Sequence, residues 1–274
     1  MDLNDYNKKR QEINNEIIIH NKSLKELKES KRDLKRLWNE SKDERRLIKA
    51  QKKILRKEKN IKINEPPHLT LLEEIGNAVT HGIGSIFAIT VFILMLIYSS
   101  SIKQVIASLI YGICMIILFT MSCLYHSFKT GSKVKRVFRR FDYSSIYLLI
   151  GGTFTPILLL FLNNKIGLII LIVQWILIST GITFVAIFGP GRLKWLHFPL
   201  YFILGWLGGI MIIPKMLSDN ISFFWWIISG GLVYTLGMIP FCFGTKKSAH
   251  FIWHFFVVAG AVIQWIGIFI TLYI

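Results

Sequence analysis

Carboxylates are scarce over most of this 274-residue chain. Residues 71–274 contain only four of them, at Glu73, Glu74, Asp142 and Asp219. The whole chain carries 33 Lys and Arg against 16 Asp and Glu, and 53% of its residues are hydrophobic. A stretch so poor in acidic groups cannot present an ordinary water-facing surface, so the composition excludes a soluble enzyme and a disordered chain.

Cysteine is scarce as well. The three cysteines, Cys114, Cys123 and Cys242, all lie in apolar runs. An odd number without close spacing argues against a disulfide framework and against a cysteine-type zinc site. We expect three buried thiols that pack as small hydrophobic side chains. The polar first 16 residues lack the apolar core of a signal peptide, so we expect the membrane segments themselves to direct insertion.

The first part of the chain, residues 1–65, is a charged arm. We expect a long helix over residues 1–63. One heptad row contains Ile13, Leu27, Leu34, Ile48 and Leu55, and a second contains Ile17, Leu24 and Trp38. Polar residues interrupt both rows, so the pattern fits a partial coiled coil, through which arms would self-associate, or a solvated single helix near a membrane. Pro66-Pro67 ends the helix and separates the arm from a second domain at 71–274.

The second domain contains seven apolar runs, each long enough to cross a bilayer core of about 30 Å with roughly 20 residues. They lie near 76–99, 104–126, 142–162, 166–188, 195–213, 223–243 and 250–272. The sequence therefore predicts an all-α, multi-pass protein of the cell membrane, a seven-transmembrane helix bundle. Glycines at 151–152, 205, 208–209 and 230–231 would allow close helix approach, and Pro156 and Pro240 predict kinks.

The basic residues of the loops predict the orientation of this bundle. Loops 129–140, 189–194 and 244–249 hold ten Lys and Arg, whereas the alternate loops hold only Lys103, Lys165 and Lys215. Lys and Arg concentrate on the cytoplasmic side of membrane proteins. We therefore expect a cytoplasmic N-terminus and an external C-terminus. Because this bias also explains much of the positive charge, we expect membrane lipids rather than nucleic acid as the partner.

Polar side chains gather at the predicted cytoplasmic ends of four spans, where ionisable groups are functional candidates. His250 and His254 are four residues apart, so a helix places both imidazoles on one face, within reach of one metal ion. His126 is a third candidate ligand from another span. Three imidazoles with an open position are typical of catalytic zinc. An isolated pair of this spacing usually binds nothing, so the combination carries the hypothesis.

Five further residues accompany the histidines, and each has a plainer alternative. Asp142 would hydrogen-bond a zinc-bound water or a ligand histidine, or else cap the third span beside Arg139 and Arg140. Ser122 would orient substrate or water, or else bond its own helix. Glu74, Asn77 and His81 share one helical face, as neighbours of the metal ligands or as a structural polar cluster. His197 we expect at the membrane interface.

Four motifs in this order resemble the haemolysin III family. They are Glu-Glu-Ile-Gly-Asn-Ala-Val-Thr-His at 73–81, Ser-Cys-Leu-Tyr-His at 122–126, Asp142 with Tyr-Leu-Leu-Ile-Gly-Gly-Thr-Phe-Thr-Pro at 147–156, and His-Phe-Ile-Trp-His at 250–254. That family belongs with the progestin and adiponectin receptor superfamily and is distantly similar to alkaline ceramidases. The resemblance implies seven spans after a cytoplasmic N-terminus. It also implies zinc on His126, His250 and His254, with Asp142 and Ser122 in the site.

Three functions are compatible with these residues. The first is a zinc-dependent membrane hydrolase of a lipid amide or ester, in which zinc activates water and polarises the carbonyl. The second, which the family name implies, is a haemolysin that forms pores. The spans carry almost no charge beyond the predicted cytoplasmic leaflet, which disfavours a polar pore. The third is a receptor-like sensor in which zinc is structural.

Overall fold

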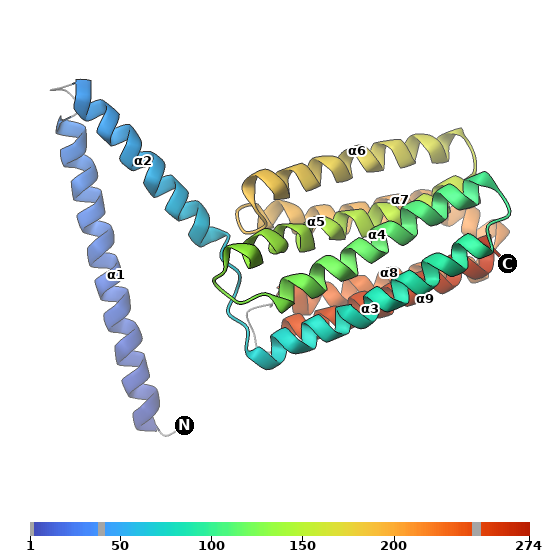
Figure 1. Cartoon of the computed structure of the whole chain (residues 1–274), viewed down its shortest axis with the longest axis horizontal. Coiled ribbons are helices and arrows are strands. Elements are labelled where there is room, and N and C mark those ends of the chain that lie inside the picture. Colours follow the sequence, from blue (N-terminus) through green and yellow to red (C-terminus); the bar gives the residue numbers. More distant parts are fainter. Residues whose placement is uncertain (1–2, 38–41, 243–247) are drawn as a thin grey trace. The chain divides into compact units, whose positions relative to one another are not determined.

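The computed structural model describes residues 3–37, 42–242 and 248–274, and every regular element in these ranges is a helix. The helices are α1 (Leu3–Leu37), α2 (Lys42–Ile63), α3 (Leu71–Ile97), α4 (Ile102–Ser127), α5 (Lys133–Pro156) with the π-helical extension η1 (Ile157–Leu162), α6 (Lys165–Phe188), α7 (Lys194–Asp219), α8 (Ile221–Cys242) and α9 (Ala249–Leu272) (Figure 1). The chain separates into two compact units, residues 1–62 and 63–274.

The first unit consists of α1 and most of α2, so the expected single helix is present as two. Exposed apolar residues on α1 include Ile13, Ile17, Leu24 and Leu27, whereas Ile48 on α2 is buried. Trp38 and the side chain of Leu34 lie outside what the structure describes. The described α1 members of both heptad rows are therefore exposed in a single chain, and association through them stays a prediction.

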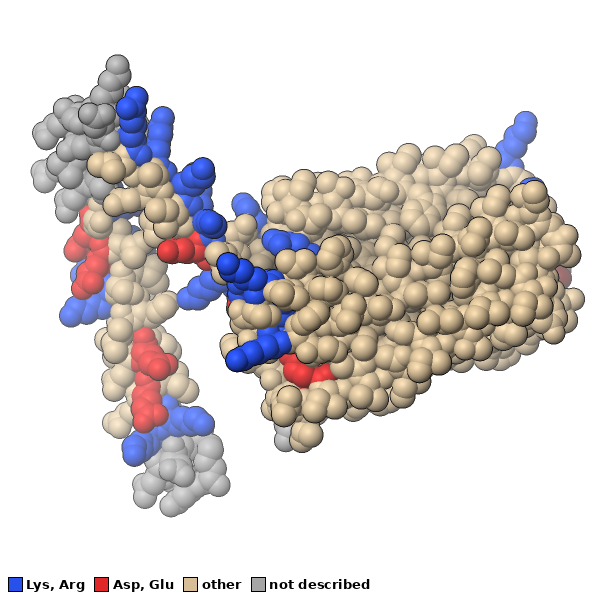
Figure 2. All heavy atoms as spheres, viewed as in Figure 1, with Lys and Arg blue, Asp and Glu red and all other residues tan. Residues whose placement is uncertain are grey.

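The second unit confirms the seven predicted spans. Each of the helices α3 to α9, with η1 extending α5, has the length and hydropathy to cross a membrane. The lateral surface of this unit seen in Figure 2 is almost free of Lys, Arg, Asp and Glu, and the basic side chains gather at one end. An uncharged belt with charged ends is what a bilayer requires of a helical bundle. The protein is therefore a multi-pass membrane protein.

The seven helices lie side by side (Figure 1). Each one contacts the next in the chain, and α9 contacts α3, which closes the ring. Helix α3 packs against both α4 and α9, and the largest interfaces join α3 to α4, α4 to α5 and α8 to α9. At Gly152 on α5 an added Cβ would come 2.7 Å from Cβ of Cys114, so glycine permits this close approach. The same expectation is wrong for Gly205 and Gly209, where an added Cβ would meet nothing within 4 Å.

The third span begins earlier than the sequence indicated. Ser132 caps α5, its side chain accepting a hydrogen bond from the backbone N–H of Lys135, so residues 133–140 of the expected 129–140 loop are helical. Asp142 lies more than two turns inside α5, and its expected alternative role as a helix cap is wrong. At Pro156 the α-helix changes into the π-helical segment η1, and the kink expected there stays a prediction.

The structure tests the expected burial of the cysteines but not the basic residues of the last predicted loop. The basic residues Lys246 and Lys247 of the predicted 244–249 loop lie outside the described residues. Cys114 is buried and Cys123 is partly buried, but Cys242 is exposed. The prediction of three buried thiols is therefore wrong for Cys242, which ends α8.

A short strap, residues 63–65, belongs to the second unit and holds its end together. Arg139 on α5 donates to the carbonyl oxygens of Asn64 and Glu65, both at 3.0 Å. The Asn64 side chain accepts from the N–H of Gly191 at 2.9 Å and donates to the carbonyl of Phe188 at 3.0 Å. The strap thus joins the start of α5 to the end of α6, ahead of the proline pair.

Candidate metal centre

Three imidazoles converge at the end of the bundle where α4 finishes and α9 begins; we call this the histidine end. His250 and His254 are one turn apart on α9, and their Nε2 atoms are 3.2 Å apart. His126, in the last turn of α4, places its Nε2 3.2 Å from that of His250. The ligand atoms of all three lie within 4.8 Å of one another, so together they could hold one metal ion.

Helix α3 supplies the groups behind His126. Glu74 Oε2 lies 2.7 Å from His126 Nδ1, and the Asn77 side-chain nitrogen lies 3.4 Å from the same atom. A carboxylate only accepts hydrogen bonds, so His126 carries its proton on Nδ1 and keeps the lone pair of Nε2 for the cluster. This is the carboxylate–histidine arrangement that orients metal ligands in other proteins. Glu74 and Asn77 therefore both lie directly beside His126, one of the three candidate ligands.

The start of α3 is fixed to the start of α9 by Glu73. Its Oε2 accepts from the backbone N–H of Thr70, completing a capping box with the Thr70 hydroxyl. Its Oε1 accepts from the backbone N–H of Ser248 at 2.6 Å. The carboxylate thus satisfies N–H groups at the beginnings of two helices, where negative charge is favourable. It fixes the helix that carries two histidines against the helix that carries Glu74.

His81, two turns along α3 from Glu74, is the fourth imidazole of the centre. Its ring stacks on that of His254 with centroids 3.7 Å apart, and its side chain is almost fully buried. Both of its ring nitrogens are buried without a hydrogen-bond partner among the described residues. His81 is therefore not a purely structural residue with satisfied hydrogen bonds, because its polar atoms are available to a bound molecule.

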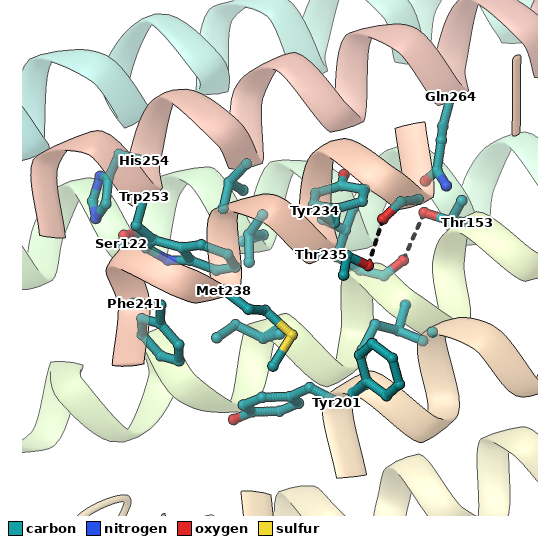
Figure 3. A pocket seen from close by; sticks show the side chains of 18 of the residues that line it. Ser122, Thr153, Tyr201, Tyr234, Thr235, Met238, Phe241, Trp253, His254 and Gln264 are labelled. Atoms are coloured by element: carbon teal, nitrogen blue, oxygen red, sulfur yellow. Dashed lines mark hydrogen bonds between the residues drawn. The ribbon is translucent and has the colours of Figure 1, made fainter. Parts of the chain in front are cut away.

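A cavity of about 110 Å³ opens from the histidines into the bundle. Ser122, Asp142, His81, His250 and His254 all line it. In Figure 3, His254 and Ser122 lie at one end of the cavity, and Thr153 and Gln264 lie at the other. The alternative expected for Ser122 was a hydrogen bond to its own helix. Its hydroxyl makes no such bond among the described residues.

The cavity is long and its walls are mainly apolar. Its lining on α9 runs from His250 to Gln264, 14 residues or about 21 Å along a helix. Phe202 on α7 lines the cavity and is 45% exposed. The cavity therefore extends from the histidine end deep into the membrane-spanning region.

The sequence alone missed two features of this centre. Lys135, counted there as a loop charge, is fully buried on α5 and lies 2.9 Å from Glu74 Oε1. Lys135, Arg139 and Asp142 follow helical spacing, which would have placed them on one face had α5 been started at residue 133. The sequence also did not indicate that His197, in the first turn of α7, is fully buried, with its Nδ1 2.9 Å from the hydroxyl of Tyr147.

Comparison with known proteins covers the same region. The haemolysin-III related family matches residues 69–265. The chain is 38% identical over 197 residues to Hemolysin-3 of Bacillus cereus, covering 70% of this chain and 88% of that protein. It is 35% identical over 195 residues to the Hemolysin-3 homolog of Bacillus subtilis (strain 168), covering 70% and 91%. It is 26% identical over 211 residues to monocyte to macrophage differentiation factor of Homo sapiens, covering 74% and 86%.

Proposed function

The chain belongs to the haemolysin III-related family, and we propose that it is a zinc-dependent membrane hydrolase that cleaves a lipid amide or ester. The match to monocyte to macrophage differentiation factor supports its place in the progestin and adiponectin receptor superfamily. The observation that carries the proposal is the convergence of His126, His250 and His254 at the mouth of an apolar cavity.

Two of the three distances between the imidazole nitrogens match zinc coordination, and the third pair lies within 4.8 Å. Zn–N bonds of about 2.1 Å at tetrahedral angles place two ligand nitrogens about 3.4 Å apart. The Nε2 atoms of His126 and His254 each lie 3.2 Å from that of His250. Three protein ligands leave one position for water or substrate, as in catalytic rather than structural zinc sites. When bound, zinc supplies Lewis acidity, which polarises a carbonyl and makes water easier to deprotonate.

The residues around the histidines supply the remaining groups for hydrolysis. The Asp142 carboxylate accepts the proton of the attacking water as a C–O bond forms at the carbonyl carbon. When the C–N or C–O bond breaks, Asp142 returns that proton to the leaving amine or alcohol. The Ser122 hydroxyl, on the same cavity wall, donates a hydrogen bond that orients the substrate carbonyl or the water.

The cavity supports a lipid as the substrate. Its walls are mainly side chains such as Leu118, Ile146 and Val257, which favour an apolar chain over a water-soluble substrate. We propose that the lipid enters beside Phe202, a lining residue on α7 that is 45% exposed. A lipid would thus place its chain along the cavity and its amide or ester at the histidines.

Metal analysis beside a turnover assay tests this proposal. Full-length protein in detergent micelles is assayed for zinc and for cleavage of a fluorescent N-acyl sphingoid amide and a fluorescent acyl ester. We expect about one zinc per chain, and loss of both zinc and turnover in His250→Ala/His254→Ala. His68→Ala is the matched control, because His68 is exposed and lies outside the cluster. Zinc-free wild-type protein, or turnover undiminished in the double variant, contradicts the proposal.

The same purified protein also tests the two other candidate functions, lysis of cells and a receptor-like sensor. The name of the relative from Bacillus cereus supports lysis of cells as a second candidate. Adding the purified protein to erythrocytes and measuring haemoglobin release tests it directly. Wild-type protein that binds zinc but cleaves neither fluorescent substrate favours the third candidate, a receptor-like sensor with structural zinc.

For the arm we propose an anionic lipid surface as the partner. On α2, Leu47, Ile54 and Ile61 are seven residues apart and exposed, so they form one apolar face. Lys49 and Arg56 lie on the opposite face. Basic amphipathic helices of this kind bind in the plane of membranes, each Lys or Arg contributing about 1 kcal/mol near an anionic surface.

A depth measurement distinguishes this partner from self-association. A spin label at Ile54→Cys should lie deeper in vesicles containing anionic lipid than one at Arg56→Cys, in full-length protein whose native cysteines are replaced. Labels that lie at equal depth at these two positions, together with dipolar coupling between chains labelled at Ile17→Cys, would instead favour a coiled coil of α1.

A further inference from the structure

Lys135 is the most deeply buried charged side chain at the histidine end. It lies on α5 with 0% of its surface exposed. Its Nζ donates to the carbonyl oxygens of Tyr125 at 3.1 Å and Phe128 at 2.9 Å. It also pairs with Glu74 Oε1 at 2.9 Å. A buried lysine is costly in a membrane protein unless every donor is occupied, and here all three donors of the ammonium have partners.

Glu74 connects this lysine to a ligand histidine. Its two oxygens are used separately, because Oε1 pairs with Lys135 while Oε2 accepts from Nδ1 of His126 at 2.7 Å. The Glu74 side chain is only 11% exposed, so water competes little for either oxygen. The result is a continuous line from Lys135 on α5 through Glu74 on α3 to His126 on α4.

Each link in this line constrains the next. The ammonium supplies the counter-charge for a carboxylate that would otherwise be buried alone. The carboxylate fixes the proton of His126 on Nδ1 and limits rotation of the ring, so the Nε2 lone pair faces His250 and His254. The same ammonium holds the carbonyls at the end of α4, the turn that carries His126.

We propose that Lys135 is a positioning residue of the metal centre, acting through Glu74 to aim the Nε2 of His126 at the metal. The inference rests on the proposed function only in requiring that the three-histidine cluster binds zinc. It assigns to a residue without contact to the metal a control over metal affinity. It also explains why one lysine is buried at this end while its helical neighbour Lys133 is exposed.

A purely structural alternative must be separated from this one. Lys135 would in that case only close the end of α4 through Tyr125 and Phe128, and its loss would lower stability without changing how a folded protein binds zinc. The two roles differ in the readout they affect. Zinc affinity, measured by competition with a chromophoric chelator, tests the positioning role. The midpoint temperature of thermal unfolding of the metal-free protein tests the purely structural role.

The experiment compares Lys135→Met with Lys133→Met in full-length protein in detergent. Loss of a group that supports a metal ligand without touching the metal typically weakens metal binding about 10- to 100-fold. We expect a loss in that range for Lys135→Met and for Glu74→Gln. Lys133→Met should bind zinc as tightly as wild type. The cobalt-substituted Lys135→Met protein should keep the absorption of a three-nitrogen site, because no ligand has been removed.

A double variant decides whether the two residues act as one unit. If Lys135 acts through Glu74, the Glu74→Gln/Lys135→Met protein binds zinc no more weakly than the weaker single variant. Wild-type affinity in Lys135→Met, or losses that simply multiply in the double variant, overturns the proposal. Should Lys135→Met not fold, Glu74→Gln and the double variant still decide, because wild-type affinity in either one overturns it. Zinc-free wild-type protein would instead refute the proposed function.

Discussion

The two ends of the membrane bundle are joined in different ways. At the histidine end, Glu74, Lys135, Arg139 and Asp142 are buried although all are ionisable. At the opposite end, which we call the distal end, neutral groups do the same work. Ser108 donates to the Tyr273 hydroxyl at 2.9 Å, and the Gln104 side chain donates to the carbonyl of Leu272 at 2.7 Å.

This difference teaches that buried charge is not needed to hold these helices together. The distal end joins the start of α4 to the end of α9 without an ionic group. Charges within a membrane domain are unfavourable unless function retains them. Their restriction to the end with the histidines therefore supports a chemical rather than a structural role for that end.

The largest effect concerns which side of the membrane each end faces. We predict that the histidine end is cytoplasmic and the distal end external, because basic residues cluster in the loops of the former. Alkaline phosphatase fused after Ile274 should be active, and the same enzyme fused after Thr130 should be inactive. The reverse pattern would place the site on the external face and contradict the orientation.

The next largest effect is expected at Asp142. Replacement by Asn removes the proton acceptor but keeps the size of the side chain, so turnover of the fluorescent amide should fall about 10²- to 10⁴-fold. Zinc content should stay at the wild-type level, since Asp142 is not a ligand. Asp219→Asn at the distal end is the control and should keep full turnover. Full turnover in Asp142→Asn would end the catalytic assignment of this residue.

An intermediate effect is expected from shortening the arm at two positions. A chain starting at Lys62 keeps the strap, and one starting at Pro66 loses Asn64 and Glu65, which leaves the buried Arg139 guanidinium without two acceptors. Unsatisfied buried groups cost about 1–3 kcal/mol each, so the shorter chain should be less stable. Thermal unfolding in detergent measures this, and both chains should insert and bind zinc. Equal stability of the two would show that the strap contributes nothing.

The smallest effect is expected at the distal end itself. Tyr273→Phe removes two neutral hydrogen bonds, one accepted from Ser108 and one donated to the carbonyl of Gln104, and should lower stability by about 1–2 kcal/mol. Zinc affinity and turnover should be unchanged, because the site is at the other end of the helices. Any loss of zinc in this variant would show that the two ends are coupled and that the contrast between them is incomplete.

The two ends also differ in how far the sequence alone predicts them. The seven spans follow from hydropathy, and the HxxxH spacing on α9 brings two imidazoles together on any helix. The burial of Lys135 and His197 does not follow, because it depends on partners from other helices. Lys135 was assigned to a loop, since local composition does not show that a basic segment begins a helix whose inner face is covered.

The position of His126 has one further consequence for the chain as a polymer. A metal shared by His126 and His250 closes a ring of 124 residues, which makes it a reversible cross-link between α4 and α9. A cross-link over such a long loop lowers the conformational entropy of the unfolded chain. In the simplest treatment this raises the free energy of the unfolded state by about 4 kcal/mol or more. Chelators should therefore lower the unfolding temperature, and on this hypothesis the supply of metal would control how long the folded protein lasts.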